Sequence, residues 1–205
     1  MKLVPKLRKE KKVINLHGDE LTDDYAWIKQ KDWQSVLKDP SKLNEEVLKY
    51  IKEENNYKSD QLKDLTDLKN KIFNELKGRI KDKDSSVPIK DGAYSYYSKY
   101  LENSEYPQFL RIDGNNEEEV IFDANLKSKD FKFFNLSSVS HSHDHKYIAY
   151  NVDTNGSEHY DLTIEEILTQ KIITKKIENT TGEIIWHPWQ EINKVVINSE
   201  IYPYL

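Results

Sequence analysis

The sequence predicts an α+β fold in which helices come first and short antiparallel strands follow. Apolar residues recur at helical spacing up to about residue 80. From residue 85 onward, β-forming runs separated by turn residues recur roughly every ten positions. Helices and strands are therefore segregated along the chain rather than alternating, which favours α+β over α/β. We expect a basic tail over 1–20, a helical segment over 21–84 and a strand-rich part over 85–205.

Composition limits the classes of function. The 205 residues are 37% hydrophobic and 33% charged, and the 13 Tyr, 6 Phe and 4 Trp are too many aromatics for a disordered chain. The formal net charge of -5 offers no basic footprint for nucleic acid. The chain has no Cys and no apolar run of signal-peptide or membrane-span length. These features predict a soluble cytoplasmic protein that contacts neither nucleic acid nor membrane.

The first forty residues are expected to hold a tail and short helices. Residues 1–20 carry an excess of Lys and Arg, which predicts a solvated tail rather than an interaction arm. Thr22-Asp23-Asp24 offers capping oxygens for a helix start, so one or two short helices should follow and end before Pro40. Trp27 and Trp33 are interpreted as packing residues.

A helical pair is predicted from about residue 41 to residue 80. Ser41 is expected to cap the first helix, with Glu45 and Glu46 in its first turn. Six apolar residues of the second helix form a stripe spaced by three and four positions: Leu62, Leu65, Leu68, Ile72, Phe73 and Leu76. Because amphipathic helices mostly bury their stripe in their own fold, we expect this apolar stripe to be core rather than a partner-binding face.

Short strands are predicted throughout the rest of the chain. They are expected at 94–100, 109–112, 120–122, 132–136, 147–152, 160–167, 171–177, 184–186 and 195–198. Between the fifth and sixth lies Asp153–Tyr160, where Asn155-Gly156 is a dipeptide that tolerates positive φ and so predicts an antiparallel hairpin. This rhythm is typical of a meander, a sandwich or a propeller.

The run His141-Ser142-His143-Asp144-His145 is the most suggestive chemical feature. Imidazoles and a carboxylate at alternating positions could hold Zn²⁺ on one side of a strand. The spacing does not match the binuclear metallohydrolase pattern, and His159 and His187 are isolated. We therefore interpret the run as a polar turn in which Asp144 supplies hydrogen bonds, with a metal-binding protein as the less favoured alternative.

No catalytic, cofactor-binding or metal-binding residue is assigned from the motifs. There is no Gly-x-Ser-x-Gly elbow, no phosphate-cradling Gly-rich loop and no Cys, so serine-hydrolase, P-loop and thiol chemistries all lack their central residue. The adjacent Ser157, Glu158 and His159 are interpreted as turn and packing residues rather than as a triad. No cofactor is expected.

Many short motifs occur in the order found in one known family. They are His17-Gly18-Asp19, Asp23-Asp24-Tyr25-Ala26-Trp27-Ile28, Trp33-Gln34 with Val36-Leu37, Glu54-Asn55-Asn56-Tyr57, Phe73-Asn74-Glu75-Leu76-Lys77-Gly78-Arg79-Ile80, Ser86-Val87-Pro88, Tyr94 to Tyr97, Glu105-Tyr106-Pro107, Phe122-Asp123-Ala124-Asn125, Ser142 to Asp144, and Asp153 with Gly156-Ser157-Glu158 and Tyr160. On these motifs the chain resembles the N-terminal part of the prolyl oligopeptidase family of serine peptidases, nearest to its oligopeptidase B (protease II) branch.

The resemblance implies a helical segment that leans on a catalytic α/β-hydrolase domain, followed by a seven-bladed β-propeller that limits access by substrate size. The Ser-Asp-His triad of such enzymes lies in the C-terminal domain, so the chain is expected to be a truncated fragment with that domain absent. Residues 85–205 would form a partial propeller of roughly two blades and the start of a third. The fragment would gate and scaffold an enzyme that cleaves small peptides after Lys or Arg.

The expected partners are short peptides and a separately encoded C-terminal catalytic fragment. The alternative is a stand-alone, non-catalytic β module that binds a peptide or protein. Without its hydrolase partner the apolar stripe would be exposed, and an incomplete propeller would leave an open sheet edge, so we expect marginal stability and a tendency to associate.

Two residues depart from the family pattern. His143 stands where the family usually has Pro, and Gln170, after Thr169, stands where it often has Gly. The first change removes a rigid turn residue and the second a flexible one. Neither is expected to abolish a hairpin.

Overall fold

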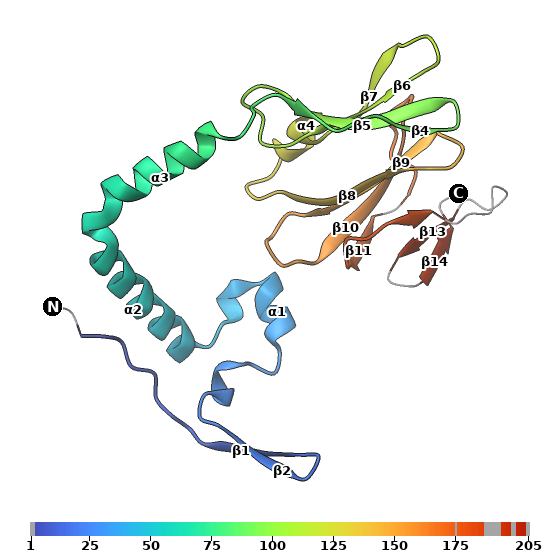
Figure 1. The fold of residues 1–205 in the computed structure, drawn as a ribbon. Coiled ribbons are helices and arrows are strands. Elements are labelled where there is room, and N and C mark those ends of the chain that lie inside the picture. The colour runs from blue at the N-terminus through green and yellow to red at the C-terminus, as the bar shows by residue number, and fades with distance from the viewer. Residues whose placement is uncertain (1–2, 175, 187–193, 198–199, 204–205) are drawn as a thin grey trace. The chain divides into compact units, whose positions relative to one another are not determined.

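The chain folds into two compact units, Met1–Ile80 and Lys81–Leu205. The structure is a computed structural model, which describes residues 3–174, 176–186, 194–197 and 200–203 (Figure 1). Helices dominate the first unit and antiparallel sheets the second, so the predicted α+β class is confirmed. No helix among the described residues has the length and hydropathy needed to cross a bilayer.

The first unit begins with a hairpin that the sequence analysis missed. Strands β1 (Lys12–Leu16) and β2 (Asp19–Asp23) pair antiparallel, and His17 and Gly18 have positive φ at the turn. Thr22–Asp24 is therefore not a helix start, which corrects the capping prediction. Upstream of the hairpin, Arg8 is held in place because its guanidinium lies 4.1 Å from the Trp27 ring and donates to Glu46 at 2.6 Å.

Helices make up the rest of this unit. The short helices are η1 (Ala26–Ile28), α1 (Trp33–Lys38) and η2 (Pro40–Lys42), and the longer ones are α2 (Glu45–Leu62) and α3 (Thr66–Gly78), which η3 (Lys63–Leu65) connects. Ser41 lies in η2, so it does not cap α2. Asn44 caps α2 instead, because its side-chain oxygen accepts from the backbone N–H groups of Glu46 and Val47.

The apolar stripe is exposed, so the expectation that it is core was wrong. Its six side chains have exposed fractions between 47% (Ile72) and 62% (Phe73). Val47 is the one buried side chain among residues 3–80. The helical spacing correctly predicted α3 for Leu68 to Leu76, whereas Leu62 ends α2 and Leu65 lies in η3. The stripe is not buried because an apolar helix face needs an apposed surface, and the described residues of the first unit do not supply one.

The second unit contains successive antiparallel sheets (Figure 1). The first sheet holds β3 (Asp84–Ser85), β4 (Ile89–Asp91), β5 (Tyr94–Tyr100), β6 (Gln108–Ile112) and β7 (Glu118–Asp123), and the short helix α4 (Ala124–Ser128) follows. The second holds β8 (Asn135–His141), β9 (Tyr147–Asp153), β10 (Tyr160–Glu166) and β11 (Ile177–Thr180) in sequence order. The third holds β12 (Ile185–Trp186), β13 (Lys194–Ile197) and β14 (Glu200–Pro203). Such consecutive meanders are the blades of a β-propeller.

The hydrophobic core lies between the sheets. One cluster joins Phe122 and Ala124 of the first sheet region to Ile148, Tyr150 and Val152 of β9. A second cluster, on Ala149, Leu162 and Ile164, includes Trp186 of the third sheet. Alternate residues of β9 therefore contribute to both clusters, as expected of a strand in a sheet covered on both faces.

Two predicted strands are displaced along the chain. The run 132–136 is largely a loop, and β8 starts only at Asn135. Phe134 belongs to the core, but the residue lies in the loop before the strand. In the run 171–177, Ile172 makes only an isolated bridge to Glu165, and β11 starts at Ile177. The strand predicted at 195–198 is β13, although residue 198 lies outside the described residues.

The hairpin predicted around Asn155-Gly156 is confirmed as β9 and β10, but its turn differs. Positive φ occurs at Gly156 (77°) and Glu158 (57°) rather than at Asn155 and Gly156. The buried Asp153 carboxylate organises this longer loop. Its oxygens accept from the backbone N–H groups of Asn155 at 2.8 Å, Gly156 at 3.0 Å and Glu158 at 2.8 Å.

Candidate functional site

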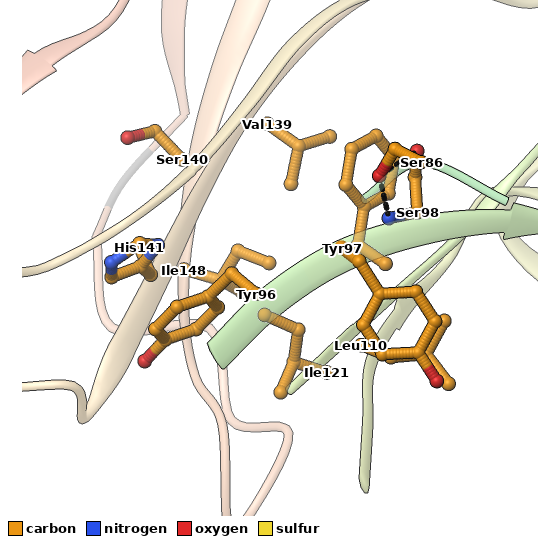
Figure 2. Close-up of a pocket in the computed structure, with 11 residues that line it drawn as sticks. Ser86, Tyr96, Tyr97, Ser98, Leu110, Ile121, Val139, Ser140, His141 and Ile148 are labelled. Carbon is orange, nitrogen blue, oxygen red and sulfur yellow. Dashed lines mark hydrogen bonds between the residues drawn. The ribbon is translucent and has the colours of Figure 1, made fainter. Parts of the chain in front are cut away.

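The candidate site lies in the second unit, where the first and second sheets meet. A cavity of about 210 Å³ opens there between β5 and β8. Figure 2 shows its mixed lining, in which Tyr96, Ile121, Val139 and Ile148 provide apolar surface and the His141 ring lies beside Tyr96. Concave, mostly apolar surface with a polar group at its edge is typical of binding sites.

The polar end of the cavity is set by the turn between β8 and β9. Ser142 Oγ donates to Asp144 Oδ1 at 2.6 Å, and the backbone N–H of Lys146 donates to the same oxygen at 3.2 Å. The N–H of Tyr147 donates to Ser142 Oγ at 3.0 Å. The prediction of a polar turn with Asp144 as its hydrogen-bond acceptor is confirmed.

This turn brings His141 against the first sheet. Its ring stacks on Tyr96 of β5 with the centroids 3.5 Å apart and the planes 3° from parallel. Its Nε2 lies 2.8 Å from Oδ2 of Asp91, the last residue of β4. His141 therefore contacts two strands of the neighbouring sheet through one ring.

His145 reaches the same place from the other end of the turn. Its Nδ1 lies 2.9 Å from the Tyr96 hydroxyl, and its carbonyl accepts from Arg111 Nη1 at 2.6 Å. A Cβ on Gly92, which has a φ of +57°, would lie 2.5 Å from His145 Nε2, so glycine is required there. The ring thus contacts Tyr94 and Tyr96 of β5 and the turn after β4, and β6 holds its backbone carbonyl.

The environment sets the charge of these groups. Burial lowers the pKa of His141 despite the opposing effect of Asp91, so the imidazole is neutral at neutral pH. The hydrogen bond with His141 lowers the pKa of the Asp91 carboxyl, which stays ionised. Asp91, His141 and His145 thus combine one anionic oxygen donor with two imidazoles.

The sequence analysis found part of this cluster. It singled out residues 141–145, but the third member is Asp91, and His143 is exposed and not in the cluster. No sequence motif around Asp91 indicated that it belongs to the cluster, because only the packing of the first sheet against the second brings it to the histidines. His187 lies outside the described residues.

The adjacent Ser157, Glu158 and His159 lie in the loop between β9 and β10. Ser157 is buried and its Oγ accepts from the backbone N–H of His159 at 3.3 Å. The Glu158 N–H donates to Asp153. These contacts hold the loop between β9 and β10 in place.

Sequence comparison gives the family. The sequence model of "Prolyl oligopeptidase, N-terminal beta-propeller domain" matches residues 5–192. The chain belongs to this family. It is 27% identical over 180 residues to "Protease 2" of Moraxella lacunata, a match that covers 83% of this chain and 24% of that protein. It is 26% identical over 200 residues to "Dipeptidyl aminopeptidase BI" of Pseudoxanthomonas mexicana, covering 89% and 26%.

Solved structures agree on the fold. Oligopeptidase B from Leishmania major superposes with a TM-score of 0.75 at 24% identity and covers 97% of this chain and 32% of that one. Oligopeptidase B from Trypanosoma brucei superposes with a TM-score of 0.72 at 20% identity, covering 95% and 30%. The chain therefore spans about a quarter of its curated relatives and corresponds to their N-terminal propeller region, and the match does not cover their catalytic domain.

Proposed function

We propose that this chain supplies the N-terminal helices and first propeller blades of a cytoplasmic serine oligopeptidase that cleaves small peptides after Lys or Arg. The observation that carries the proposal is the family match over residues 5–192. The printed sequence has no Gly-x-Ser-x-Gly motif, so the nucleophile has to come from a polypeptide segment other than residues 1–205. The role of this chain is to gate and scaffold that segment.

The charge of the chain supports a preference for basic substrates. A formal net charge of -5 attracts cationic peptides and repels anionic ones as they approach. The absence of Cys supports a reducing, cytoplasmic location. The blades act as a steric wall, because the buried core between the first and second sheets leaves no room for a folded protein to enter between them.

The apolar stripe of α3 supports the scaffolding role. Leu68, Phe73 and Leu76 are 52%, 62% and 57% exposed, and contiguous exposed apolar surface commonly marks an interface. We assign the catalytic α/β-hydrolase domain as the surface that covers it. Relatives of this family are about four times as long as the matched region, so they contain the additional chain that such a surface requires.

The test is reconstitution. Residues 1–205 and the segment that carries the serine elbow, Asp and His are produced as two separate polypeptides and mixed. We expect hydrolysis of N-blocked peptides after Arg or Lys, little after Glu, and no activity from either part alone. The matched control replaces the elbow serine by Ala, and the Leu68→Gln, Phe73→Gln double variant should weaken the reconstituted activity at least tenfold.

A different result would replace the proposal. An inactive mixture, combined with a folded monomer of this chain that holds a defined peptide, would favour a non-catalytic peptide- or protein-binding β module. Activity after Pro but not after Lys or Arg would keep the family and overturn the specificity.

The similarity to "Dipeptidyl aminopeptidase BI" favours a second candidate, removal of dipeptides from a free N-terminus. The same assay separates the two activities. A dipeptidyl aminopeptidase requires an unblocked amine, so it cleaves the free peptide and leaves the N-blocked one intact, whereas the endopeptidase cleaves both.

A further inference from the structure

We propose that Asp91, His141 and His145 form a site for one divalent transition-metal ion, with Zn²⁺ the best fit, which links the first two propeller blades. The site does not depend on the proposed peptidase function. It rests on the geometry of three side chains that come from two sheets.

The three donors already lie at nearly the right separation. One ring nitrogen of each histidine and one carboxylate oxygen of Asp91 lie within 4.8 Å of one another, and His141 Nε2 is 2.8 Å from Asp91 Oδ2. In a tetrahedral zinc site with bonds of about 2.0 to 2.2 Å, neighbouring donors are about 3.4 Å apart. The His141–Asp91 pair is closer than that value, and none of the three donors is more than 4.8 Å from another, so small side-chain rotations would bring them to a common ion.

The surroundings hold the rings in place without a metal. Tyr96 stacks on His141, and its hydroxyl lies 2.9 Å from His145 Nδ1. This leaves His145 Nε2 directed at the turn that follows Asp91, where Gly92 comes close to it. When Nε2 binds a metal, Nδ1 carries the proton and donates it to the Tyr96 oxygen, which is the usual outer contact of a metal-binding histidine.

The donor types select the metal. Two imidazoles and one carboxylate suit Zn²⁺ and its neighbours Co²⁺ and Ni²⁺ better than Mg²⁺ or Ca²⁺, which prefer oxygen donors. The Arg111 guanidinium lies near the site, where it donates to the His145 carbonyl, but its positive charge is paired with Glu119 at 2.7 Å and so repels a cation less. The Asp91 side chain is 53% exposed, so solvent can supply the fourth ligand.

The consequence is a cross-link between blades. Asp91 ends β4 in the first sheet, whereas His141 ends β8 and His145 lies in the turn between β8 and β9 in the second. A bound ion stabilises the folded chain in proportion to the logarithm of its concentration over the dissociation constant, because only the folded chain brings the donors together.

The experiment uses the untagged chain, treated with EDTA and dialysed, and measures Zn²⁺ binding by isothermal titration calorimetry. We expect one ion per chain and a higher melting temperature with Zn²⁺ than with Mg²⁺. Asp91→Asn, His141→Ala and His145→Ala should each weaken binding by about 100-fold or more, since even outer-contact variants cost 10- to 100-fold. His143→Ala is the matched control and should bind as the parent does.

Two further measurements keep the proposal testable if a ligand variant misfolds. Tyr96→Phe keeps the stacked ring and removes only the hydroxyl, so it should weaken binding about tenfold. In the parent chain, Zn²⁺ should shift the imidazole NMR signals of His141 and His145 and leave those of His143 and His159 unchanged. Binding that is absent, not stoichiometric, or lost in His143→Ala as fully as in His141→Ala would overturn the site.

Discussion

The first unit (Met1–Ile80, the helical unit) and the second unit (Lys81–Leu205, the sheet unit) contain the same kinds of apolar side chain but bury them to very different extents. Leu110, Ile148, Leu162 and Ile164 of the sheets are 0% exposed, whereas Leu68 of α3 is 52% exposed. The difference follows from how each element finds a partner. Consecutive blades cover one another because each sheet presents an apolar face to the next, but the stripe of α3 has no repeated neighbour to pack against.

This contrast implies unequal stability within one chain. Regions with a buried core unfold only at the cost of exposing it, whereas regions with little buried apolar surface open locally at low free energy. Hydrogen exchange, which reports each segment separately, is the measurement that distinguishes the two units.

The largest effect is expected from Leu162→Ala in β10. Leu162 is completely buried beside Ala149 and Trp186, so the truncation leaves a cavity and lowers the free energy of unfolding of the sheet unit by about 3 kcal/mol. Amide exchange should accelerate in β9 and β10 and stay unchanged in α2 and α3. Equal acceleration in the helices would show that the two units unfold together.

A smaller effect is expected from Asp153→Ala. The change removes the acceptor of the Asn155, Gly156 and Glu158 backbone N–H groups, and the loss should be about 2 kcal/mol because charged hydrogen bonds of a buried group are strong. The control is Asp153→Asn, which keeps one side-chain oxygen and should lose about half as much. Denaturation midpoints measure both. A loss below about 0.5 kcal/mol in the alanine variant would show that the loop does not need this carboxylate.

Gln170→Gly is expected to stabilise the sheet unit slightly. Gln170 has a φ of 56°, a left-handed conformation that strains any residue with a Cβ. Relief of that strain outweighs the greater unfolded-state entropy of glycine, for a net gain of about 0.5 kcal/mol. Gln170→Ala keeps the Cβ and should show no gain in thermal unfolding. An equal gain in the alanine variant would remove the strain argument.

The smallest effect on stability is expected from the apolar stripe. The Leu68→Gln, Phe73→Gln variant should change the free energy of unfolding by less than about 0.5 kcal/mol, because both side chains are already exposed and Gln has similar helix propensity to Leu. Sedimentation should show less self-association than the parent. A loss of several kcal/mol would mean that the stripe is buried in solution, and the contrast between the units would fail.

Sequence patterns predicted the helices and strands better than the burial of their side chains or the conformation of their turns. The spacing from Leu68 to Leu76 correctly indicated α3, but it could not say whether the stripe was covered or that the helix breaks between Leu62 and Thr66. The hairpin around Gly156 was predicted, but the conformation of its turn was not. That conformation depends on hydrogen bonds from the Asn155 and Gly156 N–H groups to the Asp153 side chain, which the Asn-Gly pattern does not reveal. The run 132–136 failed because Phe134 packs from a loop, and periodicity does not distinguish that from a strand.

Sequence by itself determined the α+β order, the family and the positions of most strands, because these depend on local propensity and on residues adjacent in the chain. The tertiary structure alone decided which groups surround the histidines. His141 and His145 are neighbours in one turn, but Asp91 joins them only because the end of β4 in the first sheet meets the end of β8 in the second. A site shared between two sheets depends on long-range packing, and no local pattern encodes it.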